Sequence, residues 1–202
     1  SKKQFTADAS HELRTPMAVI LAECDRARRK AETKEDFLAS INVIEQQGNK
    51  MNTLIEQLLS LTRIQQGTEK YPLRVCDLSG FVDACCDEFV PADERGMTLE
   101  TDIEPGVAAA YNPSLLSRAM FNLMQNAYKY GREGGNIRVS LCRKNGCAVI
   151  SVKDDGPGIP KAEQEKIWQR FYRCDTSRAE GGTGLGLSLV REIALVHHAR
   201  AE

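Results

Sequence analysis

The chain has 202 residues, of which 42% are hydrophobic and 27% are charged. This length and composition are typical of a globular protein that has one or two domains and a buried core. The formal net charge of −1 does not indicate a basic surface for nucleic acid, and no apolar run has the length of a membrane span. We therefore expect no nucleic-acid partner and no membrane contact within this stretch of chain.

Seven cysteines lie at irregular spacings, and no two of them form a Cys-x-x-Cys pair. An odd number of scattered cysteines argues against a disulfide framework and a zinc site, so we expect reduced thiols. The sequence enters a helical pattern directly, without a signal-peptide pattern, and we expect it to be a piece of a longer protein.

Residues 4–66 have the pattern of two helices joined by a short polar turn. Apolar side chains in the second helix recur every three or four residues, which predicts a broad apolar face. The main positions of this face are Phe37, Ile41, Ile44, Met51, Ile55 and Leu58. In the turn, Thr33 is placed to cap the second helix together with Asp36. Because two helices cannot enclose a core, we expect a homodimeric four-helix bundle formed through residues 4–66.

A histidine with unusual neighbours lies in the first of these helices. His11 precedes the acidic Glu12, and the hydroxyl of Thr15 follows one helical turn later, directly before Pro16. A neutral imidazole is a nucleophile near pH 7, and an adjacent carboxylate can accept the proton of its other nitrogen. A structural or solvated histidine is the common alternative. The acid, the hydroxyl and the proline together favour chemistry on the imidazole.

Residues 67–73 have the composition of a linker, and mixed helical and strand patterns follow it. We expect a helix at 77–89, strands at 97–101 and 108–111, a helix at 112–130, strands at 137–142 and 147–153, and a helix from about 184. The Asn145-Gly146 pair between the last two strands predicts an antiparallel hairpin. Residues 74–202 thus predict an α/β sandwich with helices on one face of a largely antiparallel sheet.

Four polar residues share one face of the helix expected at 112–130. They are Asn122, Asn126, Lys129 and Tyr130. An asparagine carbonyl is a neutral ligand for Mg²⁺ where phosphates supply the charge, a lysine binds phosphate, and a tyrosine can pack on a base. A polar helix face beside a loop explains this pattern equally well when it is taken alone.

Two glycine clusters follow this helix. The cluster at 154–158 begins with an aspartate, which can accept the amino group of adenine, and its glycines let the backbone approach a ring. The cluster at 182–187 opens the last helix, where free N–H groups attract anions, yet it is neither a dinucleotide fingerprint nor a P-loop. The stretch between them, 160–181, has Trp168 and Phe171 as anchors and is expected to form a lid.

Taken together and in order, five stretches resemble the H, N, G1, F and G2 boxes of the sensor histidine kinases of two-component systems. They are residues 10–16, 122–130, 154–158, 171–173 and 182–187. The resemblance covers nearly the whole chain. It implies a HisKA dimerisation and phosphotransfer domain at 1–66, a linker at 67–73, and a catalytic ATP-binding domain of the GHKL (Bergerat) type at 74–202. The implied activity is ATP-dependent phosphorylation of a histidine, transfer to an aspartate of a response regulator receiver domain, and phosphatase activity toward that regulator.

The resemblance also implies roles for the matching residues. His11 would be the phospho-acceptor, Glu12 its general base, and Thr15 a helper in dephosphorylation of the regulator. Asn126 would be the Mg²⁺ ligand and Asp154 the adenine anchor. The residues implied to bind ATP are Asn122, Asn126, Lys129, Tyr130, Asp154, Gly156, Gly158, Ile159, Arg173, Thr183, Gly184, Leu185, Gly186 and Leu187. The implied cofactors are ATP and Mg²⁺, and the implied location is the cytoplasmic portion of a membrane-anchored bacterial sensor protein.

Some positions depart from the family pattern. Asp155 stands where asparagine is usual, Asn112 stands where aspartate is common, and His198 replaces a glycine after the family histidine at His197. We therefore expect the domain to lack its C-terminal strand. The alternatives are a non-kinase ATPase of the same fold and a dimeric scaffold that only binds. The histidine motif argues against the first, and the intact nucleotide motifs argue against the second.

Overall fold

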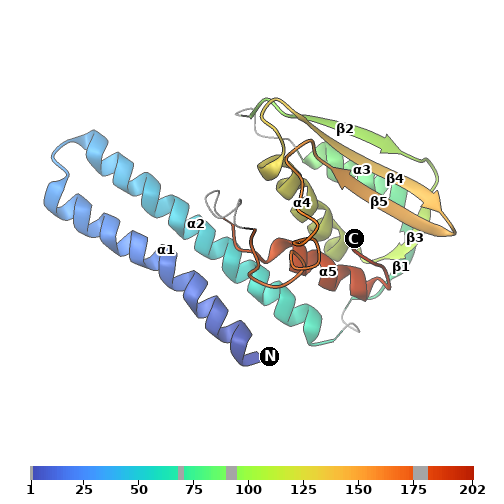
Figure 1. Cartoon of the computed structure of the whole chain (residues 1–202), viewed down its shortest axis with the longest axis horizontal. Helices are drawn as coiled ribbons and strands as arrows, with labels where there is room; N and C mark the ends of the chain where they lie inside the picture. The colour runs from blue at the N-terminus through green and yellow to red at the C-terminus, as the bar shows by residue number, and fades with distance from the viewer. Residues whose placement is uncertain (1, 68–70, 90–94, 175–181) are drawn as a thin grey trace.

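A long helical hairpin lies beside an α/β part, which packs against the second helix of the hairpin (Figure 1). The computed structural model describes residues 2–67, 71–89, 95–174 and 182–202. Helix α1 spans Lys2–Lys30 and helix α2 spans Lys34–Gln65, as the apolar periodicity predicts.

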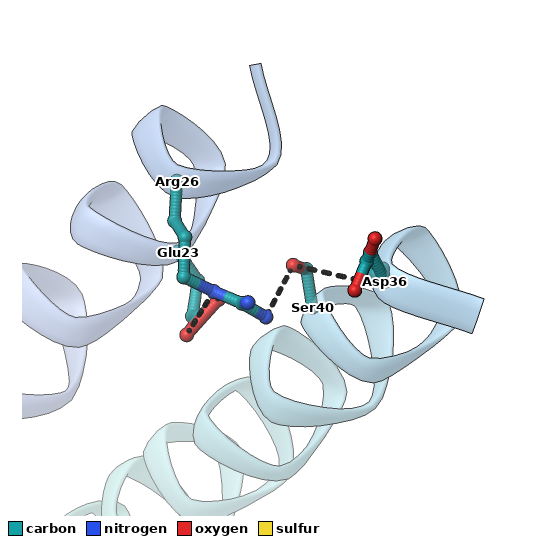
Figure 2. Close-up of polar contacts among 4 residues, drawn as sticks. All are labelled: Glu23, Arg26, Asp36 and Ser40. Atoms are coloured by element: carbon teal, nitrogen blue, oxygen red, sulfur yellow. Dashed lines mark hydrogen bonds and ion pairs between the residues drawn. The ribbon is translucent and has the colours of Figure 1, made fainter. Parts of the chain in front are cut away.

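Polar side chains fix the end of the hairpin where α1 turns into α2. The Asp36 N–H donates to Thr33 Oγ1 at 3.1 Å and the Thr33 N–H donates to the Asp36 carboxylate at 3.1 Å, so the predicted capping box is confirmed. The Thr33 hydroxyl also donates to the Asp36 carboxylate at 2.8 Å, and this bond, with those from the backbone N–H groups of Thr33 and Glu32, lowers the pKa of Asp36. Arg26 of α1 donates to Glu23 at 2.7 Å and to the buried Ser40 of α2 at 2.8 Å, which links the two helices (Figure 2).

Eight elements follow the hairpin in the described residues. They are β1 (Arg74–Asp77), α3 (Leu78–Glu88), β2 (Thr98–Ile103), β3 (Ala108–Tyr111), α4 (Pro113–Tyr130), β4 (Asn136–Lys144), β5 (Cys147–Lys153) and α5 (Gly186–Val196). In the larger sheet the order is β2-β4-β5, where β2 is parallel and β5 antiparallel to β4. Strands β1 and β3 form a separate antiparallel pair.

The observed elements confirm most of the predicted ones, with three differences. Strand β1 was not predicted, because its four residues carry only one inward side chain, that of Cys76. Strand β2 begins and ends later than the expected 97–101. Its pairing with β4 is parallel, in a sheet that was expected to be largely antiparallel. The described residues 197–202 follow α5 without a strand.

One apolar core lies between the larger sheet and the helices α3 and α4. Its buried members are Leu78, Val82, Cys85, Cys86, Val107, Tyr111, Met120, Met124, Val139 and Leu141. All seven cysteines are free thiols, and burial raises the pKa of Cys86 to about 11. This core packs α4 against the sheet.

A second core, which we call the contact core, joins the hairpin to the α/β part. Its buried members are Leu54, Leu61 and Ile64 from α2, Leu115 and Ala119 from α4, and Leu185, Leu189, Val190, Ile193 and Val196 from the α5 segment. Phe5, Trp168 and Phe171 pack against it from α1 and from the segment before α5. The contact core therefore sets how α4 and α5 lie against the hairpin.

We expect Met124→Ala to lower the free energy of unfolding by about 2–5 kcal/mol, because Met124 is 0% exposed and its truncation leaves a cavity in the core. Urea denaturation followed by circular dichroism measures the change. Leu195, which is 61% exposed on α5, is the matched control, and Leu195→Ala is expected to stay within about 0.5 kcal/mol of the native chain. Equal losses in both variants would contradict the assigned core.

Candidate functional site

His11 lies on the exposed surface of α1, where its imidazole is open to solvent. Thr15 is exposed as well, and its hydroxyl donates to the carbonyl of His11 at 3.4 Å. Helix α1 runs unbroken through the buried Pro16, which has no N–H to offer the carbonyl of Glu12. The three polar groups of the predicted motif therefore lie within about one helical turn of each other.

Helix α4 presents its predicted polar face to the glycine loop, the name we give to residues 182–186. A methyl group added at Gly186 would lie 2.9 Å from Asn122 Oδ1 and 3.9 Å from Asn126 Nδ2. One added at Gly182 would lie 2.9 Å from Lys129 Nζ. The loop backbone thus comes close to these polar side chains, and the loop and the helix face form one surface.

The first glycine cluster adjoins the end of the same helix. Asp154 follows β5, and its carboxylate accepts a hydrogen bond from the Gly156 N–H at 2.9 Å. Gly156 packs directly against the carbonyl of Tyr130, and Gly158 has a φ of +72°. The Lys129 ammonium lies 4.9 Å from the centroid of the Tyr130 ring. Two motifs about thirty residues apart in the sequence are thus brought together.

Hydrogen bonds and close backbone packing fix the conformation of the glycine loop. Thr183 Oγ1 accepts from the N–H of the buried Leu185 at 3.3 Å, which fixes the approach to α5. Gly184 has a φ of +65°, and its carbonyl accepts from the Phe171 N–H at 2.8 Å. An added methyl group would lie 2.7 Å from the Phe171 backbone, so residue 184 must be glycine. Leu187, in the first turn of α5, is half-buried.

The segment between the glycine clusters is described in part. Trp168 and Phe171 pack against the contact core, which confirms them as anchors. Arg173 is half-buried and Ile159 is exposed. Residues 175–181, the rest of the predicted lid, lie outside the described residues.

The structure does not bring His11 into the site on α4. It does bring the N-terminal end of α1 to the lid segment, because the rings of Phe5 and Phe171 lie 6.1 Å apart and the Arg170 guanidinium lies 5.1 Å from the centroid of the Phe5 ring. The acceptor candidate and the nucleotide candidates therefore occupy different parts of one molecule.

Arg95 supports the polar helix face and was not predicted from the sequence. Its guanidinium donates to the carbonyls of Lys129 at 2.7 Å, Gly131 at 2.8 Å and Tyr128, and it lies 5.5 Å from the centroid of the Tyr128 ring. It thus satisfies the carbonyls that the C-terminal end of α4 leaves free and offsets their negative charge. Arg95 lies more than thirty residues before these carbonyls, so no local sequence pattern indicates the contact.

We expect Arg95→Met to lower the free energy of unfolding by about 1.5–3 kcal/mol, because the charged donor of several hydrogen bonds is lost. Thermal unfolding followed by circular dichroism measures the change. Arg138→Met is the control, since Arg138 forms an exposed ion pair with Glu100 at 2.8 Å and is expected to contribute less than about 1 kcal/mol. A larger loss in the control would contradict the role of Arg95.

Two residues that depart from the family pattern, Asp155 and Asn112, have structural partners. The Asp155 carboxylate accepts from the N–H groups of Arg132 and Asn136, both at 3.2 Å. Desolvation raises the pKa of Asp155, but these backbone hydrogen bonds lower it, and the net direction is downward. His197 ends α5, and its Nε2 accepts from the Asn112 N–H at 3.0 Å. This contact ties the end of α5 to the start of α4.

Two protein families match the chain. His Kinase A (phospho-acceptor) domains match residues 1–67, and histidine kinase-, DNA gyrase B- and HSP90-like ATPases match residues 111–202. The chain is 37% identical over 201 residues to the sensor histidine kinase RppB of Synechocystis sp.. The matched region covers 97% of this chain and 44% of RppB. The chain thus spans about half the length, or less, of the curated relatives that it matches.

Solved structures share the fold. The histidine kinase AdeS of Acinetobacter baumannii matches 92% of this chain and 86% of its own, with a TM-score of 0.69 and 20% identity. The histidine kinase ThkA, solved in complex with the response regulator protein TrrA, matches 97% of this chain and 55% of its own, with a TM-score of 0.76 and 23% identity. Both share the fold of this chain, in which a helical hairpin is followed by an α/β domain of the GHKL type. Among the described helices of this chain, none has both the length and the apolar character of a membrane span.

Proposed function

Because this chain belongs to the sensor histidine kinases of two-component systems, we propose that it transfers the γ-phosphoryl group of ATP to His11. The phosphoryl group then passes to an aspartate on the receiver domain of a response regulator. The contact of the glycine loop with the polar face of α4 is the main support, since it places Gly186 beside Asn122 and Gly182 beside Lys129.

The groups gathered on α4 suit a nucleotide triphosphate with Mg²⁺. The side-chain carbonyls of Asn122 and Asn126 are neutral oxygen ligands, Lys129 is a cation for phosphate, and the start of α5 offers free N–H groups. Asn126 would hold the Mg²⁺ ion, which neutralises phosphate charge when it is bound. Asp154, next to the cluster at 156–158, would accept the amino group of adenine.

The chemistry at the acceptor needs few groups. The neutral imidazole of His11 attacks the γ-phosphorus as a P–N bond forms and the P–O bond to the ADP leaving group breaks. The carboxylate of Glu12 takes the proton from the other ring nitrogen and so stabilises the developing positive charge. Since His11 and the site on α4 lie on different parts of the molecule, the linker at 67–73 must let them approach.

We propose that the active form is a homodimer through residues 4–66. Large apolar side chains of both hairpin helices are exposed in the single chain, including Leu21 at 63%, Ile41 at 55% and Leu59 at 49%. A second copy would cover them in a four-helix bundle. We further propose domain bounds of 1–66 and 74–202, and a place for the chain in the cytoplasmic portion of a membrane-anchored bacterial sensor protein.

A phosphatase activity toward the same regulator is the second candidate. Thr15 supports it, because its exposed hydroxyl lies one helical turn from His11. It would position water for attack on the phospho-aspartate of the regulator. Thr15→Ala is expected to slow release of phosphate from a phosphorylated receiver domain by roughly 10-fold or more while labelling of His11 is retained. Equal rates of phosphate release with the native chain and with Thr15→Ala would show that Thr15 does not act in dephosphorylation.

Incubation with γ-labelled ATP and Mg²⁺ tests the proposed function. If the chain is a histidine kinase, the protein takes up label, and this label is stable in base and labile in acid, as expected for a phosphorus–nitrogen bond. Hydrolysis of ATP without labelling would point to a non-kinase ATPase. A dimer that neither hydrolyses ATP nor takes up label would point to a scaffold.

A further inference from the structure

Helix α2 contacts the ATP-binding domain through one continuous face. Leu54, Leu61 and Ile64 on this face are 0–4% exposed within the contact core. Gln57 lies three residues after Leu54 and four before Leu61, so it shares this face. A polar side chain thus stands in the middle of an apolar contact.

Gln57 is bonded to the glycine loop. Thr183 Oγ1 donates to Gln57 Oε1 at 2.5 Å, and Thr183 Oγ1 in turn accepts from the Leu185 N–H at 3.3 Å. A chain of two hydrogen bonds therefore runs from the hairpin to the residue directly before α5. Among the described residues, the other polar contacts between α2 and the ATP-binding domain lie away from this loop: Ser60 accepts from Arg118, and Gln65 donates to Glu192.

The bonded loop covers the groups that are proposed to receive the nucleotide. Gly186 lies against the side chain of Asn122, and Gly182 lies against the ammonium of Lys129. A triphosphate that bridges these side chains and the N–H groups of the loop must enter between them. The loop must then lift from α4, and a bond that ties Thr183 to another domain opposes that movement.

We infer that Gln57 is a positioning residue which, through Thr183, holds the glycine loop down on α4 while the ATP-binding domain is docked on the hairpin. Docking and nucleotide binding then compete, so release of the nucleotide favours the docked form and binding favours the free one. The inference rests on the proposed function, because it takes the polar face of α4 as the nucleotide site.

Gln57→Met is the direct test, since methionine keeps the shape of the side chain and removes the acceptor. Calorimetric titration of the whole chain with a non-hydrolysable ATP analogue and Mg²⁺ measures the affinity. We expect Gln57→Met to bind about 2- to 10-fold more tightly than the native chain, the range for loss of one hydrogen bond. The KM for ATP in autophosphorylation should fall by the same factor, without a fall in kcat.

Gln65→Met is the matched control, because the bond from Gln65 to Glu192 crosses the same contact at 3.3 Å but is exposed to water, so it contributes little to docking and does not touch the loop. Its affinity is expected to match that of the native chain. Gln57→Glu keeps an acceptor for Thr183 and is expected to bind no more tightly than the native chain, which provides a second test if Gln57→Met does not fold.

The outcomes separate the inference from the proposed function. Unchanged or weaker binding by Gln57→Met, beside normal binding by the native chain, overturns the inference alone. Tighter binding by Gln57→Glu or by Gln65→Met overturns it too. A native chain that binds no nucleotide overturns both the inference and the proposed function.

Discussion

A His11→Gln chain is expected to take up no phosphoryl label from γ-labelled ATP. Glutamine has a similar length and polarity but no nitrogen lone pair able to attack phosphorus, so the acceptor is lost while the exposed surface of α1 is kept. The site on α4 does not include His11. Affinity for the nucleotide should therefore stay within about 2-fold of the native value, well inside the factor of ten that 1.4 kcal/mol represents. Autoradiography and calorimetric titration give the two values.

His198→Gln is the control for this prediction, because His198 is an exposed histidine just beyond the end of α5. It should be labelled at the native rate. Label retained in His11→Gln, or lost in His198→Gln, would show that the acceptor is another residue.

Asn126→Ala is expected to lower the initial rate of labelling by a factor on the order of 100 or more, because the proposed Mg²⁺ ligand is lost. Asn126 lies half-buried beneath Gly186, and a smaller side chain leaves the apolar packing of α4 unchanged. The midpoint of thermal unfolding should therefore shift by only a few degrees, corresponding to less than about 1 kcal/mol. Nucleotide affinity in the presence of Mg²⁺ should fall with the rate.

The neighbouring Gln125 supplies the control for Asn126. It is exposed on another face of α4, and Gln125→Ala is expected to keep both the labelling rate and the affinity. Similar losses in the two variants would mean that α4 contributes through its fold rather than through a ligand at Asn126.

Elements defined by local chemistry were predictable from the sequence. Asn112 caps α4 by accepting from the Leu115 N–H at 3.1 Å, with Pro113 at the first helical position, so the helix begins directly after the predicted residue 112 and ends at the predicted residue 130. The capping box at Thr33 is local in the same way. Such sequence signals predict the helix ends correctly because the interacting groups lie within one helical turn of each other.

Contacts between distant segments were not predictable. The parallel pairing of β2 with β4 joins segments that are separated by β3 and α4, and the hydropathy of either strand is compatible with both directions. The same holds for the site. The sequence motifs identified Asn126 and Gly186, whereas Arg95 and Gln57 act through partners 34 and 126 residues away. Only the folded chain shows these supporting residues.

The central claim is that His11 receives the phosphoryl group, and mapping of the modified residue tests it most directly. The native chain is incubated with ATP and Mg²⁺, digested at neutral to alkaline pH so that a phosphorus–nitrogen bond survives, and analysed by mass spectrometry. The proposed function predicts a single phosphoryl group on His11. A phosphoryl group on a serine, threonine or aspartate instead, or an unmodified His11 in a chain that consumes ATP, would contradict it.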